Sequence, residues 1–308
     1  MKFSKNFKFT VLVPALIIVA GLVVGLICGG MNLGIDFTGG TMMTIDMGQD
    51  FVTAVVAQAF QNQGFAAQDI TVTVSGSGED AQALVRFPDT NDGEKENEIR
   101  AAVEAEIQAT YADAAVASIE RVGAVAGKEL VSNAVTSVAI ACVLMLIYIT
   151  FRFELHFGVT AVIALLVDVG VMLAGVTILR LQINSSFIAA VLTIVGYAIN
   201  DTIVIFDRIR ENRKIVNRKE MNNAALADKS VLETLPRTIN TTITTLLTIV
   251  TLYVLGVTSI KEFALPIIIG LLAGNFTSIF IAPSIWGLWT DKIAEKKTAA
   301  KTAGKKSK

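Results

Sequence analysis

Residues 187–206 read FIAAVLTIVGYAINDTIVIF. A helix of about 20 mostly apolar residues is what a bilayer core of roughly 30 Å requires. Asp201 is the exception in this stretch, because an ionised carboxylate inside hydrocarbon costs about 2.5–3.5 kcal/mol on insertion scales. Such a residue normally faces a partner or a water-filled path. The stretch therefore predicts a membrane protein in which Asp201 has a function, and proton movement is the working hypothesis.

Hydrophobic residues make up 53% of the chain, which is high for a soluble domain. Six apolar stretches are long enough to cross a membrane, so we expect a polytopic α-helical membrane protein with six transmembrane helices. The predicted spans are Phe9–Gly30, Leu130–Phe151, Val159–Leu179, Phe187–Phe206, Thr241–Gly256 and Phe263–Leu288.

Basic residues are distributed unevenly between the segments that connect these spans. Nineteen lysines and arginines fall on the side of the two termini and seven on the other. The positive-inside rule then places both termini on the cytoplasmic side of the membrane. We expect a cytoplasmic N-terminal tail (1–8), a cytoplasmic loop (207–240) that contains an interfacial helix and a turn at Pro236, and a basic cytoplasmic tail (291–308). Residues 129–290 would form a five-helix transmembrane domain.

A polar segment of about 100 residues, 31–128, follows the first span (9–30). It carries fifteen acidic and five basic residues, which is typical of a water-exposed domain on the outer side. Hydrophobic periodicity predicts the order β-α-β-β-α-β, which is that of an α+β ferredoxin-like domain. The expected elements are strand Thr41–Met47, helix Phe51–Gly64, strands Ile70–Ser75 and Ala81–Phe87, helix Asn97–Thr110 and strand Ala115–Val122.

Polar residues recur on one side of each of two neighbouring spans. Tyr197 and Asn200 share a helix face with Asp201, and the next span begins with Arg237 followed by Thr241, Thr244 and Thr248 at helical spacing. If the two stripes face each other, Arg237 reaches toward Asp201. A low-dielectric environment favours a neutral carboxyl group and a nearby guanidinium favours the ionised one, so moving the arginine would drive proton uptake and release. The alternative is a structural ion pair with threonines bonded back to their own helix.

Asp168 is a second acidic residue within a span, among apolar neighbours. It either joins the relay or ties helices together through a neutral hydrogen bond. The sequence holds none of the motifs G-x-x-x-x-G-K-S/T, H-E-x-x-H, C-x-x-C and G-x-S-x-G, and His156 is its only histidine. We therefore expect no enzymatic activity, no metal and no cofactor. Protons are the expected coupling ion, and we expect no nucleic acid as a partner.

Three segments resemble one family. GIDFTGGT at 34–41 is similar to the signature of the SecD/SecF translocase subunits, and VGYAINDTIVIFDRIREN at 195–212 and RTINTT at 237–242 are similar to motifs of SecF. The resemblance implies a subunit of the RND superfamily that pairs with SecD and acts with the SecYEG channel and SecA. It would use the proton motive force to draw unfolded preproteins outward across the lipid bilayer of a bacterial cytoplasmic (inner) membrane.

The resemblance also implies roles for single residues. Asp201 and Arg237 match proton-relay positions of the family, and Asp168 matches an acid in its third span, although Val167 stands where the family often has a histidine. Independently of the resemblance, Gly39 and Gly40, together with Asp36, are expected to form the turn between membrane and outer domain, either to couple their motions or only to shape the backbone.

Two other functions fit the same residues. An RND-type proton-driven exporter of lipids or small molecules needs the same relay but also a substrate pocket. A non-catalytic scaffold of the translocon needs no relay, and it predicts that Asp201→Asn is harmless.

Overall fold

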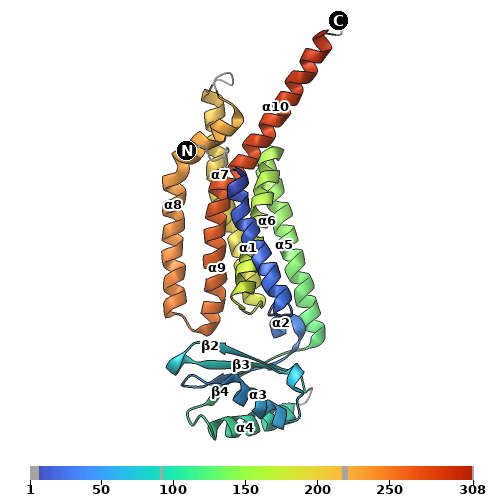
Figure 1. The fold of residues 1–308 in the computed structure, drawn as a ribbon, viewed down its shortest axis with the longest axis vertical. Helices are drawn as coiled ribbons and strands as arrows, with labels where there is room; N and C mark the ends of the chain where they lie inside the picture. Colours follow the sequence, from blue (N-terminus) through green and yellow to red (C-terminus); the bar gives the residue numbers. More distant parts are fainter. Residues whose placement is uncertain (1–6, 91–92, 217–220, 307–308) are drawn as a thin grey trace. The chain divides into compact units, whose positions relative to one another are not determined.

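The computed structural model describes residues 7–90, 93–216 and 221–306 (Figure 1). The chain divides into two compact units: a helical unit, residues 1–32 and 136–308, and a sheet unit, residues 33–135. Most of the predicted N-terminal tail, four residues of the predicted loop 207–240 and the last two residues of the basic tail lie outside the described residues.

Within the described residues, six helical segments are long and apolar enough to cross a membrane, as the sequence predicts. The last of them is continuous through three elements, which include a π-helical turn, η4. The segments are α1 (Phe7–Ile27), α5 (Ala124–Arg152), α6 (Leu155–Ile178), α7 (Ser185–Ile215), α8 (Asn223–Leu255) and α9 (Thr258–Phe276) followed by η4 (Thr277–Ile281) and α10 (Ala282–Lys306).

The predicted loop between the fourth and fifth spans is mostly helix. α7 continues to Ile215 and α8 already begins at Asn223, and the turn expected at Pro236 is wrong because Pro236 lies inside α8. The apolar stretch marks only the part of a helix that is suited to hydrocarbon. Packing extends α8 beyond it, since Leu226 and Val231 are buried and α8 packs on α10.

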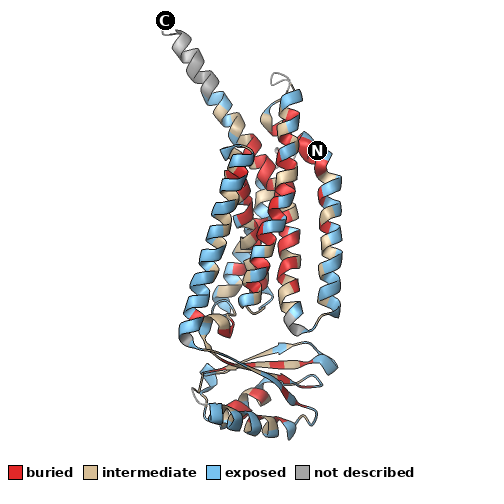
Figure 2. Cartoon of the chain, turned by 180° about the vertical axis from the view of Figure 1, so that it is seen from behind, coloured by how far each residue is buried: buried red, intermediate tan, exposed pale blue. Residues whose placement is uncertain are grey.

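Burial is uneven among the helices of the helical unit. About half of the apolar window of α6, of α7 and of the sixth span is buried, against small fractions of α1, α5 and α8 (Figure 2). α6, α7 and α9 pack on one another and form the interior of the bundle. The exposed apolar faces of α1, α5 and α8 are therefore suited to lipid or to another membrane protein.

Small residues let helices of the bundle approach closely. A Cβ atom built on Gly270 of α9 would lie 2.6 Å from Ile194 of α7, and one on Gly274 would lie 3.0 Å from Ala198. A Cβ on Gly21 of α1 would lie 2.5 Å from Ala174 of α6. Glycine is thus required where α9 meets α7 and where α1 meets α6.

The sheet unit has four antiparallel strands in the order β2-β3-β1-β4. α3 and α4 pack on one face of this sheet (Figure 1). All four predicted strands and both predicted helices are present, with boundaries shifted by up to four residues. Their bounds are β1 (Gly40–Asp46), α3 (Thr53–Asn62), β2 (Thr71–Ser75), β3 (Gln82–Phe87), α4 (Gly93–Gln108) and β4 (Ala115–Val122), with the short helices α2 (Ile35–Thr38), η2 (Ala67–Asp69) and η3 (Gly78–Asp80).

The core of the sheet unit lies between the sheet and these two helices. Phe87 of β3 is in ring contact with Phe60 and with Phe65, each at a centroid distance of 5.1 Å. Val103 and Ile107 of α4 are fully buried in the same core. The helical spacing that predicted α4 therefore marks its inward face.

Asp291 of α10 caps the first turn of α8. Its two carboxylate oxygens accept hydrogen bonds from the backbone amides of Asn223 (2.9 Å) and Ala224 (3.1 Å). The side chain of Asn222 accepts a third, from the amide of Ala225. Amides at a helix N-terminus have no partners within the helix, and an anion there also interacts favourably with the helix dipole.

Replacing Asp291 with alanine is expected to lower the stability of the helical unit by about 1 kcal/mol, the typical cost of a lost N-cap. Thermal unfolding in detergent, followed by circular dichroism, measures the loss. Glu295→Ala removes an exposed acid from the same helix and is the control. Equal stability of the two variants would contradict the capping role.

Candidate functional site

A small pocket lies in the membrane-spanning part of the helical unit, between α7, α8 and α9. Its cavity volume is about 10 Å³, close to the smallest volume that holds one water molecule. Polar side chains from all three helices meet there among apolar ones. The lining residues are Ile194, Tyr197, Ala198, Asn200, Asp201, Thr241, Thr242, Thr245, Gly270, Leu271, Gly274 and Asn275.

Asp201 is the acid of this pocket and is 9% exposed. The Oγ1 atom of Thr242 lies 3.4 Å from its Oδ2 atom. Asn275 in turn donates a hydrogen bond of 2.6 Å to Thr242 Oγ1. A line of polar side chains therefore runs from α9 through α8 to the carboxylate on α7.

The hydroxyl of Thr242 has one proton and two acceptors. Its oxygen lies 3.0 Å from the carbonyl oxygen of Thr238 and 3.4 Å from the carboxylate of Asp201. The first distance fits a hydrogen bond and the second is long for one. The contact from Thr242 to Asp201 is therefore weak, and the adjacent pocket has about the volume of one water molecule.

Arg237 lies on α8, five residues before Thr242, and its side chain is exposed. The sequence pattern predicts that it reaches toward Asp201. However, the described residues contain no ion pair within 4.0 Å between them. In the described residues the two side chains are therefore not directly paired.

Asp168 of α6 is more deeply buried, with 1% exposure. Thr277 donates a hydrogen bond of 2.5 Å to its Oδ1 atom. A Cβ on Gly274 of α9 would lie 3.7 Å from its Oδ2 atom. The sixth span therefore contacts the surroundings of both membrane acids, Asp168 and Asp201.

Two members of the threonine stripe on α8, Thr244 and Thr248, do not line the pocket. Thr244 and Thr248 are exposed, and each donates its hydroxyl proton to a carbonyl of its own helix. Thr241 lines the pocket but also bonds back to its helix, to the carbonyl of Arg237. The face that meets α7 instead carries Thr242.

Tyr197 and Asn200 line the pocket, as expected from their position on α7, although both are exposed. Asn275 and Thr277 were not predicted as site residues. Their polar side chains within the apolar sixth span are a signal that could have indicated them.

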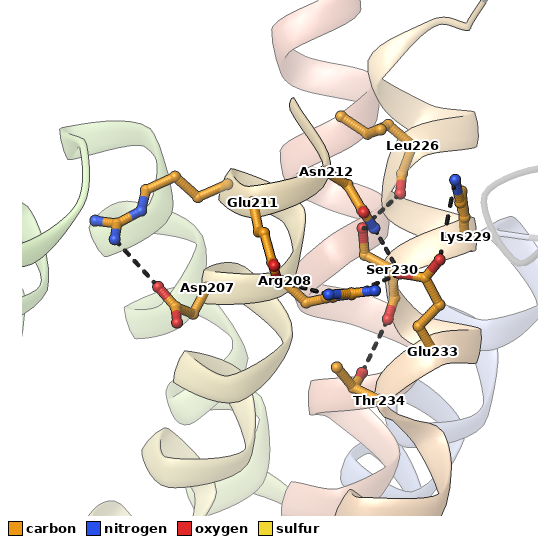
Figure 3. A network of polar contacts seen from close by, with 10 residues as sticks. Asp207, Arg208, Glu211, Asn212, Leu226, Lys229, Ser230, Glu233 and Thr234 are labelled. Atoms are coloured by element: carbon orange, nitrogen blue, oxygen red, sulfur yellow. Dashed lines mark hydrogen bonds and ion pairs between the residues drawn. The ribbon is translucent and has the colours of Figure 1, made fainter. Parts of the chain in front are cut away.

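The charged end of α7 forms a network of polar contacts with α8 (Figure 3). Arg208 makes ion pairs of 2.6 Å with Glu211 and with Glu233 of α8. Asn212 donates hydrogen bonds to Glu233 (2.7 Å) and to Ser230 (3.0 Å). Because these contacts share partners, they form a network that fixes α7 to α8 beyond the pocket. Isolated exposed ion pairs would contribute little to this.

The turn before β1 has the backbone that its two glycines suggest. Gly39 and Gly40 have φ angles of 73° and 113°, and a Cβ on Gly40 would lie 3.0 Å from the carbonyl oxygen of Phe87. Asp36 lies just before them, in α2. Backbone geometry by itself therefore gives a reason for both glycines.

In the described residues, no group of three or more histidine, cysteine, aspartate or glutamate side chains is placed to hold a metal ion.

Comparison with known proteins agrees with this architecture. The family profile "Protein export membrane protein SecD/SecF, C-terminal" matches residues 102–292, and the profile "SecD/SecF GG Motif" matches residues 29–50. The chain belongs to the SecD/SecF family. SecD/SecF proteins are subunits of the protein translocase, so this chain is a multi-pass membrane protein of protein transport.

Among similar proteins is the protein translocase subunit SecF of Alicyclobacillus acidocaldarius, 36% identical over 93% of this chain and 92% of that protein. SecF of Helicobacter pylori is 34% identical over 97% and 91% of the two chains. The crystal structure of SecDF from Thermus thermophilus superposes with a TM-score of 0.84 at 32% identity. It covers 94% of this chain and 38% of the SecDF chain.

Replacing Thr242 with valine is expected to reduce protein export several-fold, because it removes the hydroxyl between Asn275 and Asp201 at nearly constant volume. A change of about 1 kcal/mol in one hydrogen bond corresponds to roughly a fivefold change in rate. Export is measured in cells depleted of the native subunit. Thr244→Val alters an exposed threonine two residues away and should leave export unchanged; equal effects would contradict the assignment.

Gly40→Ala is expected to lower the stability of the sheet unit by about 1–3 kcal/mol, because alanine is strained at positive φ and its Cβ would press on Phe87. Resistance to a protease, assayed on the chain in membranes, measures the loss. Gly93→Ala is the control, since nothing lies within 4 Å of its Cβ position. An undamaged sheet unit in Gly40→Ala with loss of export would instead support coupled motion.

Proposed function

We propose that this protein is the SecF subunit of the Sec translocase accessory complex. It would use the proton motive force to promote the export of preproteins. The observation that carries the proposal is Asp201, which is buried beside a water-sized pocket and, in the described residues, has no ion pair with Arg237 within 4.0 Å. A structural ion pair would bring the two side chains together. A carboxyl group that takes up and releases protons needs the looser arrangement instead.

In the proposed cycle, Asp201 binds a proton when Arg237 is distant and releases it when the guanidinium approaches. The hydroxyl of Thr242, with two competing acceptors, adjusts to either state. One charge moving through 100 mV supplies about 2.3 kcal/mol. Tyr197, Asn200 and Thr241 form the polar rim through which water reaches the acid, and Asp168 is a second acid of the same relay.

SecD is the proposed partner. The relatives named SecDF from Bacillus subtilis and Thermus thermophilus match this chain over 39% and 37% of their own lengths, which indicates that a SecF-like part and a further part are joined in one polypeptide there. We also propose, from the family resemblance, that the complex works with SecYEG and SecA on unfolded preproteins. The excess of basic residues on one side of the spans supports cytoplasmic termini.

We also propose that the sheet unit is a ferredoxin-like domain on the outer side of the membrane. Its β-α-β-β-α-β order and the strand order β2-β3-β1-β4 support this assignment. The domain would contact the emerging preprotein.

The decisive test replaces Asp201 with asparagine in cells depleted of the native subunit. Proton-gradient-dependent export should fall to the level of depleted cells, because asparagine cannot carry the proton, while accumulation and assembly with SecD persist. Asp207→Asn, an exposed acid on the same helix, is the control and should export normally.

Normal export by Asp201→Asn would overturn the relay and favour a scaffold. Arg237→Met is the second variant, and it should also block export if the guanidinium drives proton release.

A further inference from the structure

The sixth span changes its helical geometry at the level of the site. The amide of Ala282 bonds to the carbonyl oxygen of Thr277, five residues back, instead of four, and the backbone is α-helical on both sides. Such π-helical turns are rare and occur frequently at functional sites. This one follows directly after Gly274 and Asn275, which line the pocket.

The first residue of the π-helical turn bonds to α6. Thr277 is 1% exposed and its hydroxyl lies 2.5 Å from Asp168 Oδ1 and 3.2 Å from the carbonyl oxygen of Gly274. Its single proton belongs to the shorter contact, which leads to the acid. The hydroxyl of Thr277 is thus a direct side-chain hydrogen-bond partner of Asp168.

The second residue of the turn bonds in another direction, to α7. Ser278 is fully buried, and its Oγ atom lies 2.8 Å from the hydroxyl of Thr202 and 3.2 Å from the carbonyl oxygen of Ala198. Thr202 is the residue after Asp201. Two consecutive hydroxyls thus bind two different helices, each beside one of the membrane acids.

These contacts are possible because α6, α7 and α9 approach closely at one level. The Cβ position of Gly274 lies 3.0 Å from Ala198 of α7 and 3.7 Å from the carboxylate of Asp168 on α6. A larger residue there would push the turn away from one of the two helices. The turn is therefore fixed from both sides and cannot rotate without losing one bond.

We propose that Thr277, the first residue of the π-helical turn, is a positioning residue for Asp168 and presents its own hydroxyl to the carboxylate. A buried polar group without a partner is costly, so this bond also decides which rotamer Asp168 adopts. The consequence for export rests on the proposed function. The positioning itself does not.

The test is pH-induced infrared difference spectroscopy of the full-length chain reconstituted in phospholipid vesicles. The carboxyl stretching band of Asp168 is identified by its loss in Asp168→Asn. In Thr277→Val the band should move to higher wavenumber, because the carbonyl loses its hydrogen bond. In Thr277→Ser it should stay at the wild-type position, because the hydroxyl is retained. If Asp168 stays ionised throughout, its carboxylate bands are compared in the same way.

Ser278→Ala is the matched control, since it removes the neighbouring hydroxyl that bonds α7 and should leave the Asp168 band nearly in place. An unmoved band in Thr277→Val, or equal shifts in Thr277→Val and Ser278→Ala, would overturn the positioning role.

Export gives the second readout. Thr277→Val should reduce proton-gradient-dependent export several-fold, and Thr277→Ser should restore it. If Asp168→Asn exports normally, the proposed relay role of Asp168 fails, while the infrared comparison still decides whether Thr277 positions it.

Discussion

The close approach of α9 to α7 at Gly270 and Gly274 is the contact on which the rest of the site depends. Without side chains at these positions, the backbone of α9 lies against Ile194 and Ala198. With α9 in this position, Asn275 contacts Thr242 of α8, and the π-helical turn contacts Asp168 of α6 and Thr202 of α7. In hydrocarbon, helix association relies on such close packing and on interhelical hydrogen bonds, because lipid tails are as apolar as the side chains.

Two sets of polar contacts hold α8 in register with this pair of helices. Asp291 fixes the N-terminus of α8 to α10, and the network around Glu233 fixes it to α7. Both lie on the same side of the pocket, near the start of α8. Thr242 and Arg237 are therefore presented to Asp201 by a helix that is held at one end, while the far end of α8 is largely exposed.

Much of the architecture could be predicted from the sequence, because a bilayer imposes a length and a composition on each span. The number of spans and the strands of the sheet unit follow from hydrophobic runs and from alternation. The turn expected at Pro236 was wrong, since a helix outside the hydrocarbon need not be apolar and packing on α10 stabilises it. The orientation of α8 could not be read either, as its threonines occupy nearly every face.

The sequence by itself determined the family, the spans and the two acids, since a carboxylate in an apolar run is conspicuous wherever the helix lies. Only the tertiary structure decided which side chains meet them: Thr242 instead of Thr244 or Thr248, and Asn275 and Thr277 of the sixth span. The physical reason is that helical periodicity gives the relative directions of side chains on one helix. The rotation of that helix against its neighbours depends on long-range packing, here at two glycines and a π-helical turn.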